Sequence, residues 1–199
     1  MHWTAGRHQA NATDKRHYHE IVEGDGTRVE GDYLPEANLS TSDGVYAAHI
    51  RKFGTASIGL SMAAMAGARE GPFSVGKYPV KDKQLAVFVN MVAEYADTYD
   101  IEISRETVLS HAEVPITHGI AQPGKWDITW IPGMSKPGDP IEVGDRLRQM
   151  VKDAQQGVFA SGVSGFAAES KTKEELRATI LELFDRLARQ DSVTASDRT

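Results

Sequence analysis

HYHEIVEGDGTRVEGDY, residues 17–33, is the stretch of sequence that decides the fold class. It contains an apolar, β-branched run, then the dipeptide Asp25-Gly26, then a second run of similar character. Two such runs on either side of an Asp-Gly turn predict a β-hairpin. The sequence HWTAG at 2–6 is typical of the end of another short strand. A β-sheet is therefore expected to begin early in the chain.

Three further segments add one strand and two helices to this prediction. SIGLSMAAM, residues 57–65, is small and apolar throughout, which is typical of a central strand buried on both faces. In residues 81–99 the apolar side chains recur at spacings of three and four, which predicts an amphipathic helix. A second helix is expected over residues 142–155. Strands and helices therefore mix, as they do in an α/β domain.

The connecting segments are expected to be irregular. Residues 7–16 are polar and turn-prone, and residues 34–56 are rich in Pro, Ser, Gly and Asp, so both are predicted to be loops. After His111, prolines and glycines favour irregular backbone as far as KWDITW at 125–130. If that last segment is extended, Lys125 and Asp127 point to one face.

The chain divides into two parts. Residues 1–155 are predicted to form one α/β domain, and residues 156–199 a flexible segment, an added C-terminal helix and a frayed tail. The apolar face of that helix consists of Leu176, Ile180, Leu183, Phe184 and Leu187. It could dock on the domain, mediate dimers or help to bind a partner, and the sequence leaves these alternatives and the oligomeric state open.

Composition excludes several classes of function. The 199 residues carry a net charge of −6, which argues against nucleic acid as a partner, and no run is apolar enough to span a membrane. The chain has no cysteine, so any metal must be bound by histidine and carboxylate. The N-terminal sequence lacks the pattern of a secretory signal peptide, so synthesis in the cytoplasm is expected.

Histidines near predicted strand ends are the candidate functional residues. Four of the seven lie there, namely His2, His17, His19 and His111. Catalytic zinc takes three protein ligands and leaves a fourth position open, and His2, His111 and Asp127 can supply such a set. Their spacing is not a compact motif, so the residues alone indicate an α/β domain with a candidate His/Asp metal site.

Five blocks in the first 130 residues resemble a known family. HWTAG (2–6), HYHEIVEGDGTRVEG (17–31), SIGLSM (57–62), SHAEV (110–114) and GKWDI (124–128) are similar, in this order, to the type 2 N-acetylmuramoyl-L-alanine amidases. These enzymes are related to phage lysozymes and to peptidoglycan recognition proteins. The resemblance implies a mixed central β-sheet flanked by helices.

The resemblance also implies roles for individual residues. It makes His2, His111 and Asp127 the ligands of Zn²⁺, and it places Lys125 and Tyr18 beside the metal. Zinc lowers the pKa of bound water and polarises the scissile carbonyl, while a lysine and a tyrosine can stabilise the oxyanion. His19 matches an interior position, and we expect it to be a buried, hydrogen-bonded histidine.

Two features depart from the family pattern. Several of these amidases have a glutamate that can act as general base where this chain has Ser61. Glu113 is a weak candidate to replace that base, because a glutamate is more often an ordinary surface residue than a catalytic one. Only Met1 precedes His2, so either the start of the chain has been trimmed or the first strand is expected to be a stub.

The implied function is hydrolysis of the amide bond between N-acetylmuramic acid and L-alanine in bacterial peptidoglycan. A phage- or prophage-type lytic enzyme is expected, acting on the cell wall after release or delivery, with wall recycling as the second choice. A non-catalytic peptidoglycan-binding module and a zinc peptidoglycan peptidase are the alternatives. THGIA at 117–121 weakly resembles a motif of such zinc peptidases, but the aspartate expected after it is not at the right spacing.

Overall fold

The predicted hairpin is present. In this computed structural model, which describes residues 1–157, β2 (Glu20–Val22) pairs antiparallel with β3 (Arg28–Glu30). The C-terminal helix and tail expected from the sequence lie outside the described residues, and so does nearly all of the flexible segment before them.

The sheet is mixed and has four strands in the order β1-β4-β2-β3. β1 (His2–Trp3) and β2 both run parallel to β4 (Leu60–Met62), which lies between them and is buried throughout. The prediction of a central strand within residues 57–65 is therefore confirmed. β1 is only two residues long.

One face of the sheet packs against α2 (Asp82–Thr98), which confirms the helix predicted for residues 81–99. Trp3, Met62 and Val22 belong to the core shared with this helix. Successive side chains of a strand point to opposite faces, so His2 and Ser61, which are register partners, lie together on the other face.

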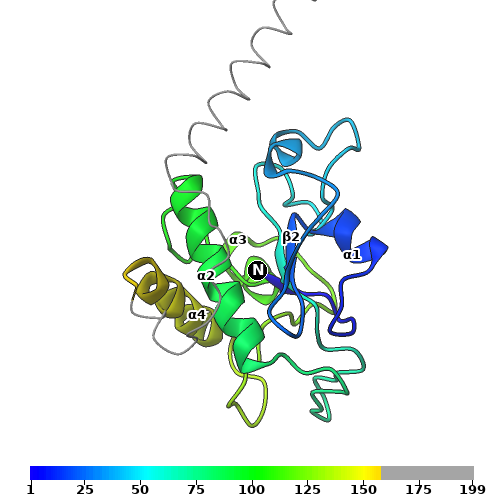
Figure 1. Ribbon diagram of the computed structural model, residues 1–199, viewed down its shortest axis with the longest axis vertical. Helices are drawn as coiled ribbons and strands as arrows, with labels where there is room; N and C mark the ends of the chain where they lie inside the picture. The colour runs from blue at the N-terminus through cyan, green and yellow to red at the C-terminus, as the bar shows by residue number, and fades with distance from the viewer. Residues whose placement is uncertain (158–199) are drawn as a thin grey trace, which may run out of the picture.

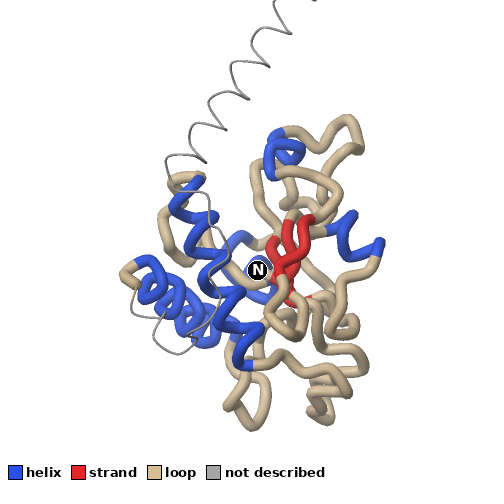
Figure 2. The backbone as a smooth tube through the Cα atoms, viewed as in Figure 1, coloured by secondary structure: helices blue, strands red, loops and turns tan. Residues whose placement is uncertain are grey.

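α4 (Pro140–Gln155) packs on α2, and the Asp139 carboxylate caps it by accepting from the backbone N–H groups of Ile141 and Glu142. Figure 1 traces the chain through these elements, and Figure 2 shows α2 and α4 on one side of the sheet. The helix predicted for residues 142–155 is confirmed with an earlier start. No helix within residues 1–157 is long and apolar enough to cross a membrane.

Two stretches that were predicted to be irregular contain short helices. Within residues 7–16 the prediction fails because Asn11 and Asp14 form a reciprocal capping box that starts α1 (Ala12–His17). The long connection 34–56 is irregular apart from the single 3₁₀ turn η1 (Pro35–Leu39).

The segment after Ser110 is also more regular than predicted. It forms η2 (His111–Glu113) and α3 (Val114–His118) before the irregular stretch begins. Pro115 does not prevent this, because it occupies the first turn of α3, where a missing N–H costs no helical hydrogen bond.

The core that α2 shares with the sheet and with α4 should contribute most of the stability. Phe88 is completely buried there, so Phe88→Ala is expected to lower the free energy of unfolding by ~3–5 kcal/mol through lost burial and the cavity left behind. Urea denaturation measures this change. Asp97→Ala, on the exposed side of the same helix, should cost ~0.5 kcal/mol or less; equal losses in both variants would contradict the assignment of the core.

Candidate metal centre

Three predicted ligands meet at one point although they are far apart in sequence. His2 Nδ1 lies 3.1 Å from His111 Nδ1. Asp127 Oδ2 lies 3.3 Å from His111 Nδ1 and 3.7 Å from His2 Nδ1. All three side chains are buried, and one ligand atom from each falls within 4.8 Å of the others. The group could hold a metal ion.

These separations suit a small tetrahedral cation. Zinc binds imidazole nitrogen and carboxylate oxygen at about 2.0–2.1 Å, so two ligands of a tetrahedral site stand ~3.3 Å apart. The three observed separations bracket that value. Because only three protein atoms converge, a fourth position is left for water or substrate, which is the arrangement of catalytic zinc sites.

The hydrogen bonds of His111 leave its Nδ1 free to bind a cation. Its Nε2 lies 3.0 Å from Gln122 Oε1. The Gln122 amide nitrogen donates to the backbone carbonyl of Arg51, so its oxygen must be the acceptor toward the imidazole. His111 therefore carries its proton on Nε2, and Nδ1 presents a lone pair to His2 and Asp127.

A similar chain of contacts orients His2. The single proton of the Ser57 hydroxyl points to the backbone carbonyls of residues 53 and 54, of which that of 54 is closer, so the hydroxyl oxygen accepts from His49 Nε2, which lies 3.1 Å away. His49 Nδ1 is then an acceptor, and His2 Nε2, at 3.2 Å, donates to it. His2 Nδ1 is therefore also unprotonated.

This assignment of protons places two lone pairs and a carboxylate face to face. Burial, reinforced by the nearby N-terminal ammonium, lowers the pKa of His2 to about 3, so its ring is neutral at physiological pH. The two Nδ1 lone pairs and the Asp127 carboxylate repel one another unless a cation lies between them. The donor set therefore fits a metal.

His49 is a site residue that the sequence did not reveal. It lies in the long connection 34–56, where no pattern marks it, and it is buried against His2. Gly59 allows this, because a Cβ at that position would come within 2.3 Å of the His49 ring. The sequence holds one indirect signal, namely a glycine just before a fully buried strand.

Tyr18 lies beside the centre, as the resemblance implied. Its ring centroid is 5.3 Å from that of His2. Burial raises the pKa of its hydroxyl, and the negative charges of Asp127 and Asp14 raise it further, whereas the nearby Ser61 opposes the shift. The hydroxyl therefore remains protonated and can donate a hydrogen bond.

Lys125 is not brought to the centre in the way the sequence suggested. The segment 125–130 is not extended, because Thr129 N–H bonds back to the Trp126 carbonyl and Ile128 has a left-handed φ of +62°. Lys125 is exposed, and its ammonium forms no hydrogen bond or ion pair within residues 1–157, whereas Asp127 is buried. The condition for placing both side chains on one face by strand alternation, an extended segment, is therefore not met.

His19 is the buried, hydrogen-bonded histidine that was expected. Its Nδ1 accepts from the backbone N–H of Gly59 at 2.9 Å, and its Nε2 lies 3.0 Å from Asn38 Oδ1. Both ring nitrogens are satisfied by groups other than the three ligands, so His19 has a structural role.

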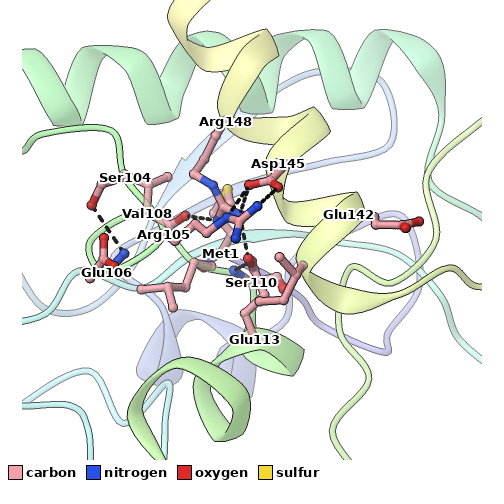
Figure 3. Close-up of polar contacts among 12 residues, drawn as sticks. Met1, Ser104, Arg105, Glu106, Val108, Ser110, Glu113, Glu142, Asp145 and Arg148 are labelled. Carbon is pink, nitrogen blue, oxygen red and sulfur yellow. Dashed lines mark hydrogen bonds and ion pairs between the residues drawn. The ribbon is translucent and has the colours of Figure 1, made fainter.

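Glu113 is neither a surface residue nor a free base, contrary to both expectations from the sequence. It is fully buried, and its carboxylate pairs with Arg148 on α4 at 2.7 Å while accepting from the Ser110 backbone N–H at 2.7 Å. Figure 3 shows Arg148 reaching from α4 toward Glu113. Arg148 also donates to the carbonyl of Val108, so this pair fixes the segment that carries His111.

Comparisons with models of known protein families, with curated proteins and with solved structures found no match.

The position of His49 predicts a measurable effect on metal affinity. His49→Phe removes the acceptor that orients His2 and fixes its tautomer, so zinc affinity should fall by about 10- to 100-fold. Isothermal calorimetry on the metal-free protein measures this. His17→Phe, which changes an exposed histidine bonded to its own helix, is the control and should leave affinity unchanged. Equal affinities in the two variants would show that His49 does not orient the ligand.

The Glu113–Arg148 pair makes a separate prediction about stability. Glu113→Ala leaves the buried Arg148 guanidinium with Asp145, 2.7 Å away, as its remaining carboxylate partner, so it should cost ~1–3 kcal/mol in urea denaturation. The double variant Glu113→Ala with Arg148→Met also removes the guanidinium that has lost its buried partner, so it should recover part of that loss. A double variant as unstable as the sum of its single changes would mean that the two side chains are not coupled.

Proposed function

We propose that this protein is a zinc-dependent N-acetylmuramoyl-L-alanine amidase that cleaves the bond between the glycan and the stem peptide of bacterial peptidoglycan, as a phage- or prophage-type lytic enzyme. The observation that carries the proposal is the convergence of His2 Nδ1, His111 Nδ1 and an Asp127 oxygen. None of these three atoms carries a proton that it could donate to the others. These are the residues that the resemblance to the type 2 amidases designates as ligands, and the mixed sheet suits that family.

Each residue of the centre then has a defined task. His2, His111 and Asp127 would hold the ion, and His49 and Gln122 keep the two imidazoles in the tautomer that binds it. When bound, zinc supplies Lewis acidity, which polarises a carbonyl and makes water nucleophilic near neutral pH.

Tyr18 is the residue best placed to stabilise developing charge. Its hydroxyl keeps its proton because burial raises its pKa, and its ring lies against His2. A donor of this kind is typically worth ~10²–10³-fold in rate. Lys125 remains a proposed second donor, since it is exposed two residues before Asp127 and a bound substrate would offer it a partner.

The proton transfer differs from the pattern of several members of the resembled family. Ser61 is completely buried, lies on the same face of the sheet as His2 and is near Tyr18. It occupies the position at which several of the resembled amidases have a glutamate. Glu113 does not replace it, because its carboxylate is committed to Arg148 and to the Ser110 N–H. We therefore assign to Tyr18 the donation of a hydrogen bond or proton, and not the role of the missing base, because its hydroxyl keeps its own proton.

The reaction is tested on purified peptidoglycan. The zinc-loaded protein should release new amino groups on L-alanine without new reducing sugars. Asp127→Ala should abolish this release, and Tyr18→Phe should lower its rate by ~10²–10³-fold at unchanged zinc content. Tyr33→Phe, a tyrosine outside the centre, is the matched control and should keep full activity.

Other products would contradict the proposal. New reducing ends would indicate a glycosidase, and new amino groups on residues other than L-alanine would indicate a peptidase. Wall binding by a protein that holds no zinc and releases nothing would indicate a binding module of related fold.

A further inference from the structure

Ser61 is a completely buried polar residue beside the metal centre, and its hydroxyl forms no hydrogen bond to any group within residues 1–157. It lies in the middle of the central strand β4, with His2 of β1 on one side and Ile21 of β2 on the other. A buried hydroxyl without a partner costs free energy that an alanine at the same position would not cost. Such a group in the middle of a buried strand therefore points to a role other than stability.

The two residues that the sheet places beside Ser61 offer it no partner. His2 uses both ring nitrogens, because Nε2 donates to His49 and Nδ1 faces the other two ligands. Ile21 is apolar. Tyr18 does supply a polar group here, since its ring also lies against His2, with the two centroids 5.3 Å apart. Ser61 and Tyr18 therefore both adjoin the first metal ligand.

The hydroxyls of Ser61 and Tyr18 are complementary as donor and acceptor. Tyr18 keeps its single proton for a hydrogen bond to developing charge, so its oxygen still has lone pairs that can accept. Ser61 has a proton and no acceptor for it within the described chain. The electrostatics agree with a bond in this direction: burial and nearby negative charges raise the pKa of Tyr18, whereas Ser61 lowers it, as a donor to the phenol oxygen does.

A hydrogen bond from Ser61 would fix the direction of the Tyr18 proton. The backbone of Tyr18 is already held at the end of α1, where its N–H donates to the Asp14 carbonyl at 3.0 Å. Its hydroxyl proton, however, can rotate about the C–O bond to meet an acceptor. A donor on the side of β4 occupies one lone pair of the oxygen and leaves the proton to point away from the sheet.

We propose that the Ser61 hydroxyl donates to the Tyr18 oxygen and so directs the Tyr18 proton to an oxygen bound at the fourth position of the metal centre. The bond closes when Tyr18 turns its proton to that oxygen. It also polarises the Tyr18 O–H, which becomes a stronger donor. Ser61 is thus a positioning residue that acts through Tyr18 and does not touch the substrate. This inference rests on the proposed zinc chemistry.

Binding of acetohydroxamate to the zinc-loaded protein tests the inference, because this probe binds zinc through oxygen and needs no cleavage of peptidoglycan. Tyr18→Phe removes a hydrogen bond to a charged oxygen, so the affinity measured by calorimetry should fall ~10- to 100-fold. Ser61→Ala leaves the Tyr18 proton undirected, and the affinity should fall ~3- to 10-fold. The double variant should lose no more than Tyr18→Phe alone, because Ser61 acts only through the phenol.

Two controls separate positioning from a structural role. Ser61→Ala should bind zinc as tightly as the unmodified protein and resist urea at least as well, because it removes a buried hydroxyl that has no partner. Ser110→Ala also removes a completely buried, unpartnered serine hydroxyl, directly before the ligand His111. It should leave the affinity for acetohydroxamate unchanged.

A crystal structure of the acetohydroxamate complex shows the bond itself. Ser61 Oγ should lie ~2.7–2.8 Å from the Tyr18 hydroxyl oxygen. A separation beyond about 3.5 Å would overturn the inference. So would additive losses in the double variant, or a loss of zinc affinity or stability in Ser61→Ala.

Failure of the proposed function would look different. A protein that shows this coupling between Ser61 and Tyr18, yet releases no amino groups of L-alanine from peptidoglycan, would retain the positioning role of Ser61 and lose the amidase assignment.

Discussion

The structure depends on one electrostatic constraint: two imidazole lone pairs and a carboxylate face one another in a buried space. His2 Nδ1 and His111 Nδ1 are 3.1 Å apart, and Asp127 stands against both. Neither ring can relieve the contact by moving its proton, because His49 and Gln122 hold both protons on the opposite nitrogens. A cation between the three atoms removes the repulsion and turns an unfavourable cluster into a binding site.

The rest of the fold positions these atoms from three distant parts of the chain. β1 is only two residues long, yet β4 holds it on one side and the segment before His111 holds it on the other. There the N-terminal ammonium of Met1 donates to the Leu109 carbonyl, and the His111 N–H donates to the Met1 carbonyl. The buried pair of Glu113 and Arg148 ties that same segment to α4, so both histidine ligands rest on one framework.

Patterns with a strong physical period were predictable, and features set by tertiary contacts were not. The hairpin, the central strand and α2 followed from alternation, apolar runs and helical spacing. α1 was missed because a capping box outweighed a polar composition. The ligand set came from resemblance and not from spacing. His49 and the buried state of Glu113 could not be predicted, because each depends on contacts between segments far apart in sequence.

The proposed function requires that one ion is bound by the three convergent atoms, and anomalous diffraction from crystals of the zinc-loaded protein tests this most directly. Data collected above and below the zinc absorption edge should show a single strong anomalous peak about 2.0–2.1 Å from His2 Nδ1, His111 Nδ1 and one oxygen of Asp127. The ring nitrogens facing His49 and Gln122 should take no part. A zinc peak elsewhere, or no peak in crystals whose solution holds excess zinc, would contradict the assignment of the centre.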